Sequence, residues 1–406
     1  MIESMILKNV DYFDGKSEEL LRGRTIVIND GKIDAITDED IQYESIKAID
    51  LSGYTVTPGF IDCHMHMLLE EVPNKDIQLT MTTPGGERYP NADAAVAYLG
   101  ALNCRKMLDA GFTTVIDGGG CNFIECALRE ALNKGYLDGP NYFIAGKQLT
   151  TNPAHFVGFS TEPYGPYGMR KAIRDLMWWG VDHVKLQLSP PIRMLGRNPN
   201  ACDFTKEEVM AAIDEAHNYG VSVHAHTRGA ASIKRFLKAD GDIVVHGTGI
   251  DDEGIEIMVK KGTYLLPTLL SPTPNPAKEL VIAKSKSVMD VLYQTAQVHW
   301  DSAKRAYQAG VKIAFSTDSG ALGIPVGENA SEFLNLKEIG MSNLEVLRTA
   351  TSEAAIAIGK QDVYGLISKG MVADLTVMNG NPLEDLTATQ SVVMTIKGGR
   401  VVSDKR

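Results

Sequence analysis

Apolar and polar positions in the middle of the chain follow a pattern typical of parallel strands covered by helices. Between residues 58 and 358, short β-rich runs are separated by amphipathic helical stretches. Several of the runs are continuously apolar, as expected for strands buried on both faces. Strands are predicted at 55–62, 113–119, 141–146, 182–188, 221–226, 242–247, 263–269 and 312–318, and helices at 92–111, 205–220, 229–240, 251–262 and 277–309.

Eight strand–helix alternations of this length predict an α/β fold, a (β/α)8 TIM barrel over residues 58–358. The predicted helix 205–220 has clear end signals, because Thr205 and Glu208 form a capping-box pattern and Gly220 ends the stretch. An open doubly wound sheet is the alternative interpretation, but no GxGxxG motif follows the first strand.

The two ends of the chain have a different pattern, with short β-rich arms and glycine turns. Asn29-Asp30-Gly31 marks a hairpin near the N-terminus, and the C-terminal segment contains MVADLTVMNGNP and VVMTIKGGRVV. Neither end holds enough apolar residues to fold alone. We therefore predict one small β-sandwich, formed by residues 1–57 together with residues 359–406 and interrupted by the barrel.

Composition narrows the functional classes. The net charge of −11 argues against nucleic-acid binding, which needs a basic face. No apolar run of about 18 residues appears, so no membrane span is expected. The N-terminus shows no signal peptide, and five cysteines without zinc-finger spacing indicate reduced thiols. The predicted location is cytoplasmic.

Polar residues cluster where the predicted strands end, which is the rim that carries the active site in barrels of this kind. Residues i and i+2 of a strand point the same way, so His64 and His66 can reach one cation. Five of the nine histidines lie at such ends, and their co-location with a lysine and a carboxylate favours a metal site over isolated structural roles. Imidazole and carboxylate ligands suit Zn²⁺, and also Mn²⁺, Fe²⁺ or Co²⁺. The candidates are His64, His66, Lys185, His224, His226, His246 and Asp318.

The motifs TPGFIDCHMH, DHVKLQL, VSVHAHT, VVHGTGID and FSTDSG, in that order, resemble the amidohydrolase superfamily. The stretch from FTKEEVMAAIDEAHNYGVSVHAH to VVHGTGIDDEGIEIMVKKGTYLLPTL is similar to prolidase-type dipeptidases, Xaa-Arg dipeptidases and N-acyl-amino-acid hydrolases, and to ochratoxin-hydrolysing amidases. The resemblance covers essentially the whole chain. It implies the barrel, the split β-sandwich and a homo-oligomer.

The resemblance also implies a binuclear metal centre, with two Zn²⁺ ions per chain. His64, His66 and Asp318 would bind the buried metal, and His226 and His246 the second one. A free ammonium would repel two dications, so Lys185 would be carboxylated by CO₂ and bridge the metals as a carbamate. His224 is the rival to His226, which we choose because it lies nearer the end of its strand.

The activity implied is hydrolysis of an amide or peptide bond, in a dipeptide or N-acyl amino acid, by a hydroxide that the two metals activate. Asp318 would act as general base and then acid, and His155 would orient the carbonyl or stabilise the oxyanion. Arg228 would bind a substrate carboxylate, or alternatively be a solvated residue at a helix start. Asp62 is expected to orient neighbouring groups rather than bind metal.

Two features leave the substrate open. This chain has TTNPAHFVGF where such dipeptidases tend to have a GGH loop, and VKLQLSPP where they have a small-residue turn. A hydrolytic deaminase or cyclic amidohydrolase, such as an imidazolonepropionase-like enzyme, is the first alternative; Lys185 counts against it because single-metal deaminases generally do without this lysine. A catalytically silent binding module is the second.

Overall fold

The terminal segments of the chain combine into one eight-stranded sheet. The computed structural model describes residues 4–39, 46–69, 92–151, 159–190, 198, 200–271, 286–321 and 323–406. The sheet has the order β18-β17-β16-β5-β1-β2-β3, and β4 also pairs with β1. Its strands are β1 (Met5–Tyr12), β2 (Leu21–Asn29), β3 (Lys32–Thr37), β4 (Lys47–Asp50), β5 (Tyr54–Pro58), β16 (Leu375–Asn379), β17 (Val392–Lys397) and β18 (Arg400–Asp404).

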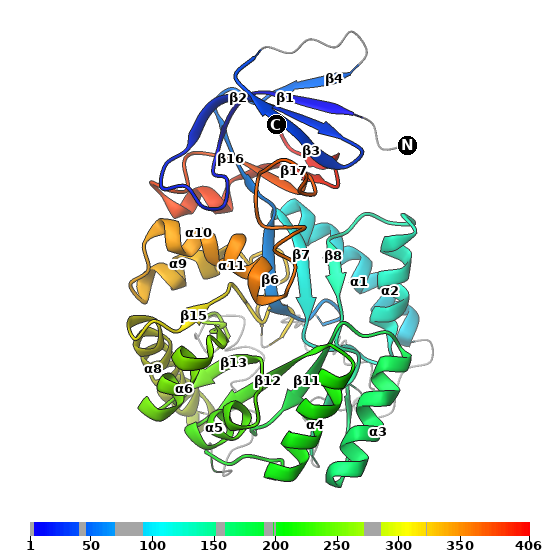
Figure 1. Cartoon of the computed structure of the whole chain (residues 1–406), viewed down its shortest axis with the longest axis vertical. Coiled ribbons are helices and arrows are strands. Elements are labelled where there is room, and N and C mark those ends of the chain that lie inside the picture. Colours follow the sequence, from blue (N-terminus) through cyan, green and yellow to red (C-terminus); the bar gives the residue numbers. More distant parts are fainter. Residues whose placement is uncertain are drawn as a thin grey trace.

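Strand β16 joins the two halves, because it pairs antiparallel with β5 from the N-terminal segment. The sheet curls, so that residues from β2 and β17 share one hydrophobic core that is separate from the core under the helices. The two edges of the sheet approach each other where the β2–β3 turn meets the β17–β18 turn. There, a Cβ on Gly399 would lie 2.9 Å from Gly31 Cα. Strand β1 and the C-terminus of the chain lie together at this end of the molecule (Figure 1).

The middle of the chain forms two parallel sheets. One has three strands in the order β6-β7-β8 and the other has seven in the order β10-β9-β11-β12-β13-β14-β15. Most of these strands are buried along their whole length, including β7, β11 and β13, and their sequences therefore lack a solvent-exposed polar face. They are β6 (Phe60–Met65), β7 (Phe112–Asp117), β8 (Asn141–Phe143), β9 (Gln148–Leu149), β10 (Ser160–Thr161), β11 (His183–Gln187), β12 (Ser222–Arg228), β13 (Ile243–Thr248), β14 (Tyr264–Leu266) and β15 (Lys312–Ile313).

Main-chain hydrogen bonds connect the two parallel sheets on both sides. Cys63 N in β6 donates to Phe315 O, which follows β15, over 2.9 Å. On the other side, Asp182 N before β11 donates to Ile144 O after β8, over 2.8 Å. Apart from β10, which pairs with β9 on the side away from β11, the described strands are therefore linked in the order in which they follow along the chain.

Helices surround these strands (Figure 1). At the N-terminus of α4, Glu208 N donates to Thr205 Oγ1 and Thr205 N donates to Glu208 Oε2, so the predicted capping box is confirmed. Of the predicted helix 277–309, the part before residue 286 lies outside the described residues. The helices are α1 (Ala92–Asp109), α2 (Ile124–Asn133), α3 (Gly165–Trp178), α4 (Lys206–Asn218), α5 (Ala230–Lys238), α6 (Asp252–Lys261), α8 (Lys286–Gln308), α9 (Ser331–Glu338), α10 (Asn343–Thr349), α11 (Ser352–Ala357) and the 3₁₀ helix η1 (Leu386–Gln390).

The prediction of one strand over 55–62 was wrong, because the chain changes sheet at Gly59. Strand β5 belongs to the terminal sheet and β6 to the parallel strands. A Cβ at Gly59 would overlap the side chain of Thr113, so only glycine fits this close crossing. The predicted strand 312–318 is also shorter, since β15 ends at Ile313. Among the described helices, none combines the length and apolar character that crossing a membrane requires.

Candidate metal centre

The backbone around β6 brings His64, His66 and Asp318 to one place. His64 O accepts hydrogen bonds from Thr317 N and Asp318 N, and His66 N donates to Ser319 O over 2.7 Å. These bonds fasten the segment after β15 to the end of β6. Asp318 has a φ of 62°, a left-handed conformation that is uncommon outside glycine and is often found at functional sites.

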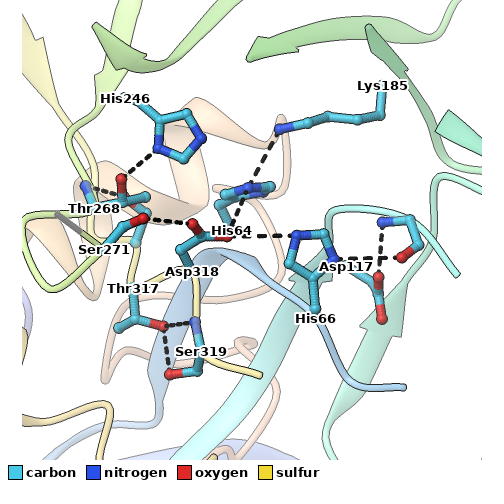
Figure 2. Close-up of polar contacts among 12 residues, drawn as sticks. His64, His66, Asp117, Lys185, His246, Thr268, Ser271, Thr317, Asp318 and Ser319 are labelled. Carbon is cyan, nitrogen blue, oxygen red and sulfur yellow. Dashed lines mark hydrogen bonds and ion pairs between the residues drawn. The ribbon is translucent and has the colours of Figure 1, made fainter. Parts of the chain in front are cut away.

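The three side chains converge, and all three are buried. Asp318 Oδ1 lies 3.6 Å from His64 Nε2 and 3.4 Å from His66 Nε2. One potential ligand atom from each residue falls within 4.8 Å of the others. Figure 2 shows the carboxylate of Asp318 facing the two imidazoles. This is the donor set and spacing that a divalent cation requires.

The hydrogen bond on the far side of His66 supports this assignment. Nδ1 of His66 lies 3.3 Å from the carbonyl oxygen of Gly119, which can only accept, so Nδ1 carries the proton. In the neutral ring, Nε2 then presents a lone pair to a carboxylate oxygen. Two such acceptors need a proton or a cation between them, and a carbonyl-held histidine is typical of metal ligands.

Lys185 lies beside His64, with 3.3 Å between Lys185 Nζ and His64 Nε2 (Figure 2). Its side chain is 1% exposed. Burial lowers the pKa of this amine to about 7, although the charge of Asp318 opposes the shift. Unlike an ordinary lysine, a large share of its amine is therefore uncharged and nucleophilic near neutral pH.

The second pair of predicted ligands lies next to the first. The His246 ring packs edge-on against His64 at 5.8 Å and against His226 at 4.6 Å between ring centroids. His246 Nδ1 is 2.6 Å from Thr268 Oγ1, which leaves its Nε2 for a cation. Like Asp318, His246 has a positive φ, of 69°.

His224, the rival strand-five candidate, lies differently from His226. Its ring stacks on His183 at 4.3 Å, and its Nε2 is 3.1 Å from Ser222 Oγ. In the strand register it lies opposite Lys185, whereas His226, two residues nearer the end of β12, lies opposite Gln187. The described geometry thus brings His226 to His246 and pairs His224 with His183.

The remaining predicted residues fall into three cases. Arg228 is buried, so the alternative prediction that it is a solvated residue at a helix start is wrong. Its NH1 lies 3.3 Å from Thr248 Oγ1, and burial lowers the pKa of its guanidinium to about 10. Asp62 orients its neighbours, as predicted, because it accepts hydrogen bonds from His64 N, Thr317 and Asn329. His155 lies outside the described residues.

Several residues that contact the candidate metal ligands were not predicted from the sequence. A Cβ at Gly118 would overlap the His64 ring, so the glycine run 118–120 is needed for close approach. Thr268 and Ser271 contact His246 and Asp318, and nothing in their local sequence signals this. Of these residues, only the glycine run, which directly follows a strand, could have been recognised in the sequence as part of the site.

The parallel strands and the buried cluster of His64, His66 and Asp318 suit a hydrolase whose site can bind a metal ion. Comparisons with known proteins also identify the chain as a hydrolase. The Amidohydrolase family model matches residues 55–402, so the chain belongs to the amidohydrolase family. Ochratoxinase from Aspergillus niger is 27% identical, over 94% of this chain and 83% of its own. With these relatives, the chain is a hydrolase that acts on C–N bonds.

Solved structures point to the same subgroup. A Xaa-Pro dipeptidase with methionine bound in its active site is similar, with a TM-score of 0.85 and 29% identity over 99% of this chain and 100% of that one. A prolidase in complex with N-methylphosphonate-L-proline has a TM-score of 0.88 and 26% identity over the same shares. The chain is prolidase-like and ochratoxinase-like.

Proposed function

We propose that this chain is a binuclear metal-dependent amidohydrolase that cleaves the amide bond of a dipeptide or an N-acyl amino acid. The observation that carries the proposal is the convergence of His64, His66 and Asp318, with Lys185 beside them. Relatives whose names specify Xaa-Pro dipeptidase, prolidase and ochratoxinase support the substrate class.

His64, His66 and Asp318 would hold one cation, and His226 and His246 the other. The nitrogen-rich set favours Zn²⁺, with Mn²⁺, Fe²⁺ or Co²⁺ as alternatives. Lys185, as a carbamate, would bridge the two positions. The uncharged form of its buried amine is the form that reacts with CO₂, and a pKa of about 7 makes that form abundant near neutral pH. When bound, the cations supply Lewis-acid polarisation of a carbonyl and lower the pKa of water.

The chain's own residues supply proton transfer and substrate orientation. Asp318 would accept the proton of the attacking water and deliver it to the departing amine. Burial raises the pKa of this carboxyl, but the adjacent His66 imidazole, the hydrogen bond from Ser271 and the charge of Lys185 outweigh it and keep the pKa below its ordinary value. Asp318 is therefore ionised and ready to act as a base at neutral pH.

Arg228 would bind the substrate's free carboxylate. Its guanidinium is buried, and within the described residues its Nε has no hydrogen-bond partner. A buried cation with unused donors favours an anionic group on the substrate. This matches a dipeptide or an N-acyl amino acid, each of which carries a carboxylate close to the scissile bond.

The architecture we infer is a closed (β/α)8 barrel over residues 58–358, with residues 1–57 and 359–406 forming a separate β-sandwich domain. The closure is supported by the bond from Cys63 N to Phe315 O and the bond from Asp182 N to Ile144 O. In such a barrel, the carboxyl ends of the strands form the catalytic rim.

The test is a panel of dipeptides and N-acyl amino acids assayed against zinc-loaded protein, with metal content measured on the same samples. Two metals per chain with release of a free amino acid is the expected result. One metal per chain, with ammonia released from a cyclic or aromatic amine, would instead favour a deaminase. Two metals with no hydrolysis anywhere in the panel would contradict the proposed substrate class.

A further inference from the structure

The segment 267–271, which follows β14, touches both parts of the metal centre, and we name it the clasp. Thr268 Oγ1 lies 2.6 Å from His246 Nδ1, and Ser271 Oγ donates to Asp318 Oδ2 over 2.7 Å. Figure 2 shows the two hydroxyls approaching from the same side. One short segment thus orients a ligand of each proposed metal position.

A buried carboxyl group holds the middle of the clasp. Glu332 in α9 is fully buried, and its two oxygens accept hydrogen bonds from Leu269 N at 2.6 Å and Leu270 N at 2.8 Å. Asn335 Nδ2 also donates to Glu332, over 3.2 Å. A carboxyl group that receives two adjacent backbone N–H groups fixes the direction of the main chain between Thr268 and Ser271.

A buried histidine holds the start of the clasp. His299 in α8 is fully buried, and its Nε2 donates to Pro267 O over 2.6 Å. Its Nδ1 lies 2.6 Å from Thr248 Oγ1, and Thr248 also contacts Arg228. His299 therefore connects the clasp to the end of β13, the strand that carries His246.

Thr268 itself indicates that the clasp is held in place. It has a φ of 49°, which is unfavourable for a β-branched residue and persists only where the surroundings impose it. Its main-chain N–H donates to Ser316 Oγ over 3.3 Å, and its hydroxyl contacts His246. A segment that served packing alone would need neither this conformation nor a buried carboxyl group behind it.

We propose that Glu332 and His299 are positioning residues of the metal centre: by holding the clasp, they keep Thr268 against His246 and Ser271 against Asp318. The inference rests on the proposed function, because it concerns the same metal positions. Groups behind metal ligands typically contribute 10- to about 100-fold to metal affinity. Loosening the clasp should therefore release metal while the fold persists.

The experiment follows zinc loss from the zinc-loaded full-length protein into a fluorescent chelator. Thr268→Val keeps the shape and β-branching but removes the hydroxyl, and should speed zinc loss from one position by about 10- to 100-fold. Thr268→Ser restores the hydroxyl and should restore slow loss. Glu332→Gln and His299→Phe should speed the loss as well, because each removes a bond that holds the clasp.

Thr389→Val is the matched control. Thr389 is fully buried in η1, and its hydroxyl donates to Leu386 O over 2.7 Å, in a segment that packs on β16 and on α9 but makes no hydrogen bond to the clasp among the described residues. This variant should keep zinc as the wild type does, and the metal-free forms of Thr268→Val and Thr389→Val should unfold at similar temperatures.

The possible outcomes distinguish the proposed role of the clasp from the proposed function of the protein. Wild-type retention of zinc in Thr268→Val and Glu332→Gln would overturn the clasp and leave the proposed function standing. Equal zinc loss in Thr389→Val would also overturn it, since general loosening would then explain the effect. A wild-type protein that binds none of Zn²⁺, Mn²⁺, Fe²⁺ and Co²⁺ would overturn both the clasp and the proposed function.

Discussion

Replacing Glu125 with glutamine should stabilise the protein, and the gain should depend on pH. Glu125 lies in the first turn of α2 and is fully buried. Neither of its carboxyl oxygens has a hydrogen-bond partner on another residue of the described chain. Burial, with the nearby charge of Asp117, raises the pKa of this carboxyl from 4.5 to about 8.

The sign and the size of this change in the free energy of unfolding follow from proton linkage. Between pH 4.5 and 8, the unfolded chain loses this proton while the folded state keeps it, so the free energy of unfolding falls as pH rises. Each pH unit in that window costs the folded state about 1.4 kcal/mol, which accumulates to about 3 kcal/mol at pH 7. Below pH 4.5 both states are protonated and the contribution is fully present.

Glu125→Gln has nearly the same shape and no titration. It should therefore raise the free energy of unfolding of the metal-free protein by about 3 kcal/mol at pH 7 and change it little at pH 4.5. Urea unfolding, followed by both fluorescence and circular dichroism, measures this difference. Exposed Glu256 in α6 provides the control, because Glu256→Gln should change stability little at either pH. A Glu125→Gln gain equal at pH 4.5 and pH 8 would refute the reasoning.

Four further predictions concern the proposed reaction. Asp318→Asn should lower kcat by at least about 100-fold while much of the metal stays bound, and near-wild-type turnover would end the general-base role. Lys185→Met should reduce bound metal from two ions per chain to one or none by elemental analysis; two ions in the variant would exclude the carbamate bridge. His226→Ala should lose one metal and His224→Ala neither, and the reverse result would exchange their roles. Arg228→Met should raise KM by at least about 10-fold for substrates with a free carboxylate, but not for their amides; an equal rise for both would refute carboxylate binding.

The local sequence predicted much of the fold and of the candidate site. Short runs rich in β-branched and apolar residues marked β7 and β13, because strands buried on both faces have no solvent-exposed polar side. The HxH spacing placed His64 and His66 together, since the direction of side chains repeats every two residues in a strand. The capping box of α4 was also readable, because its two partners are three residues apart.

Other features depend on contacts between distant segments, which no local pattern encodes. The change of sheet at Gly59 is imposed by Thr113, on a strand that lies more than 50 residues later. The orientation of His246 and Asp318 depends on positive φ values that their surroundings hold.

The sequence by itself determined which residue types lie at the strand ends, because alternation and turn chemistry act over a few residues. Only the tertiary structure decided that the His246 ring packs against both His64 and His226, and that Glu332 holds the main chain between Thr268 and Ser271. The physical reason is that hydrogen bonds and ring contacts require atoms within a few ångströms, and packing alone brings segments 60 residues apart to that distance.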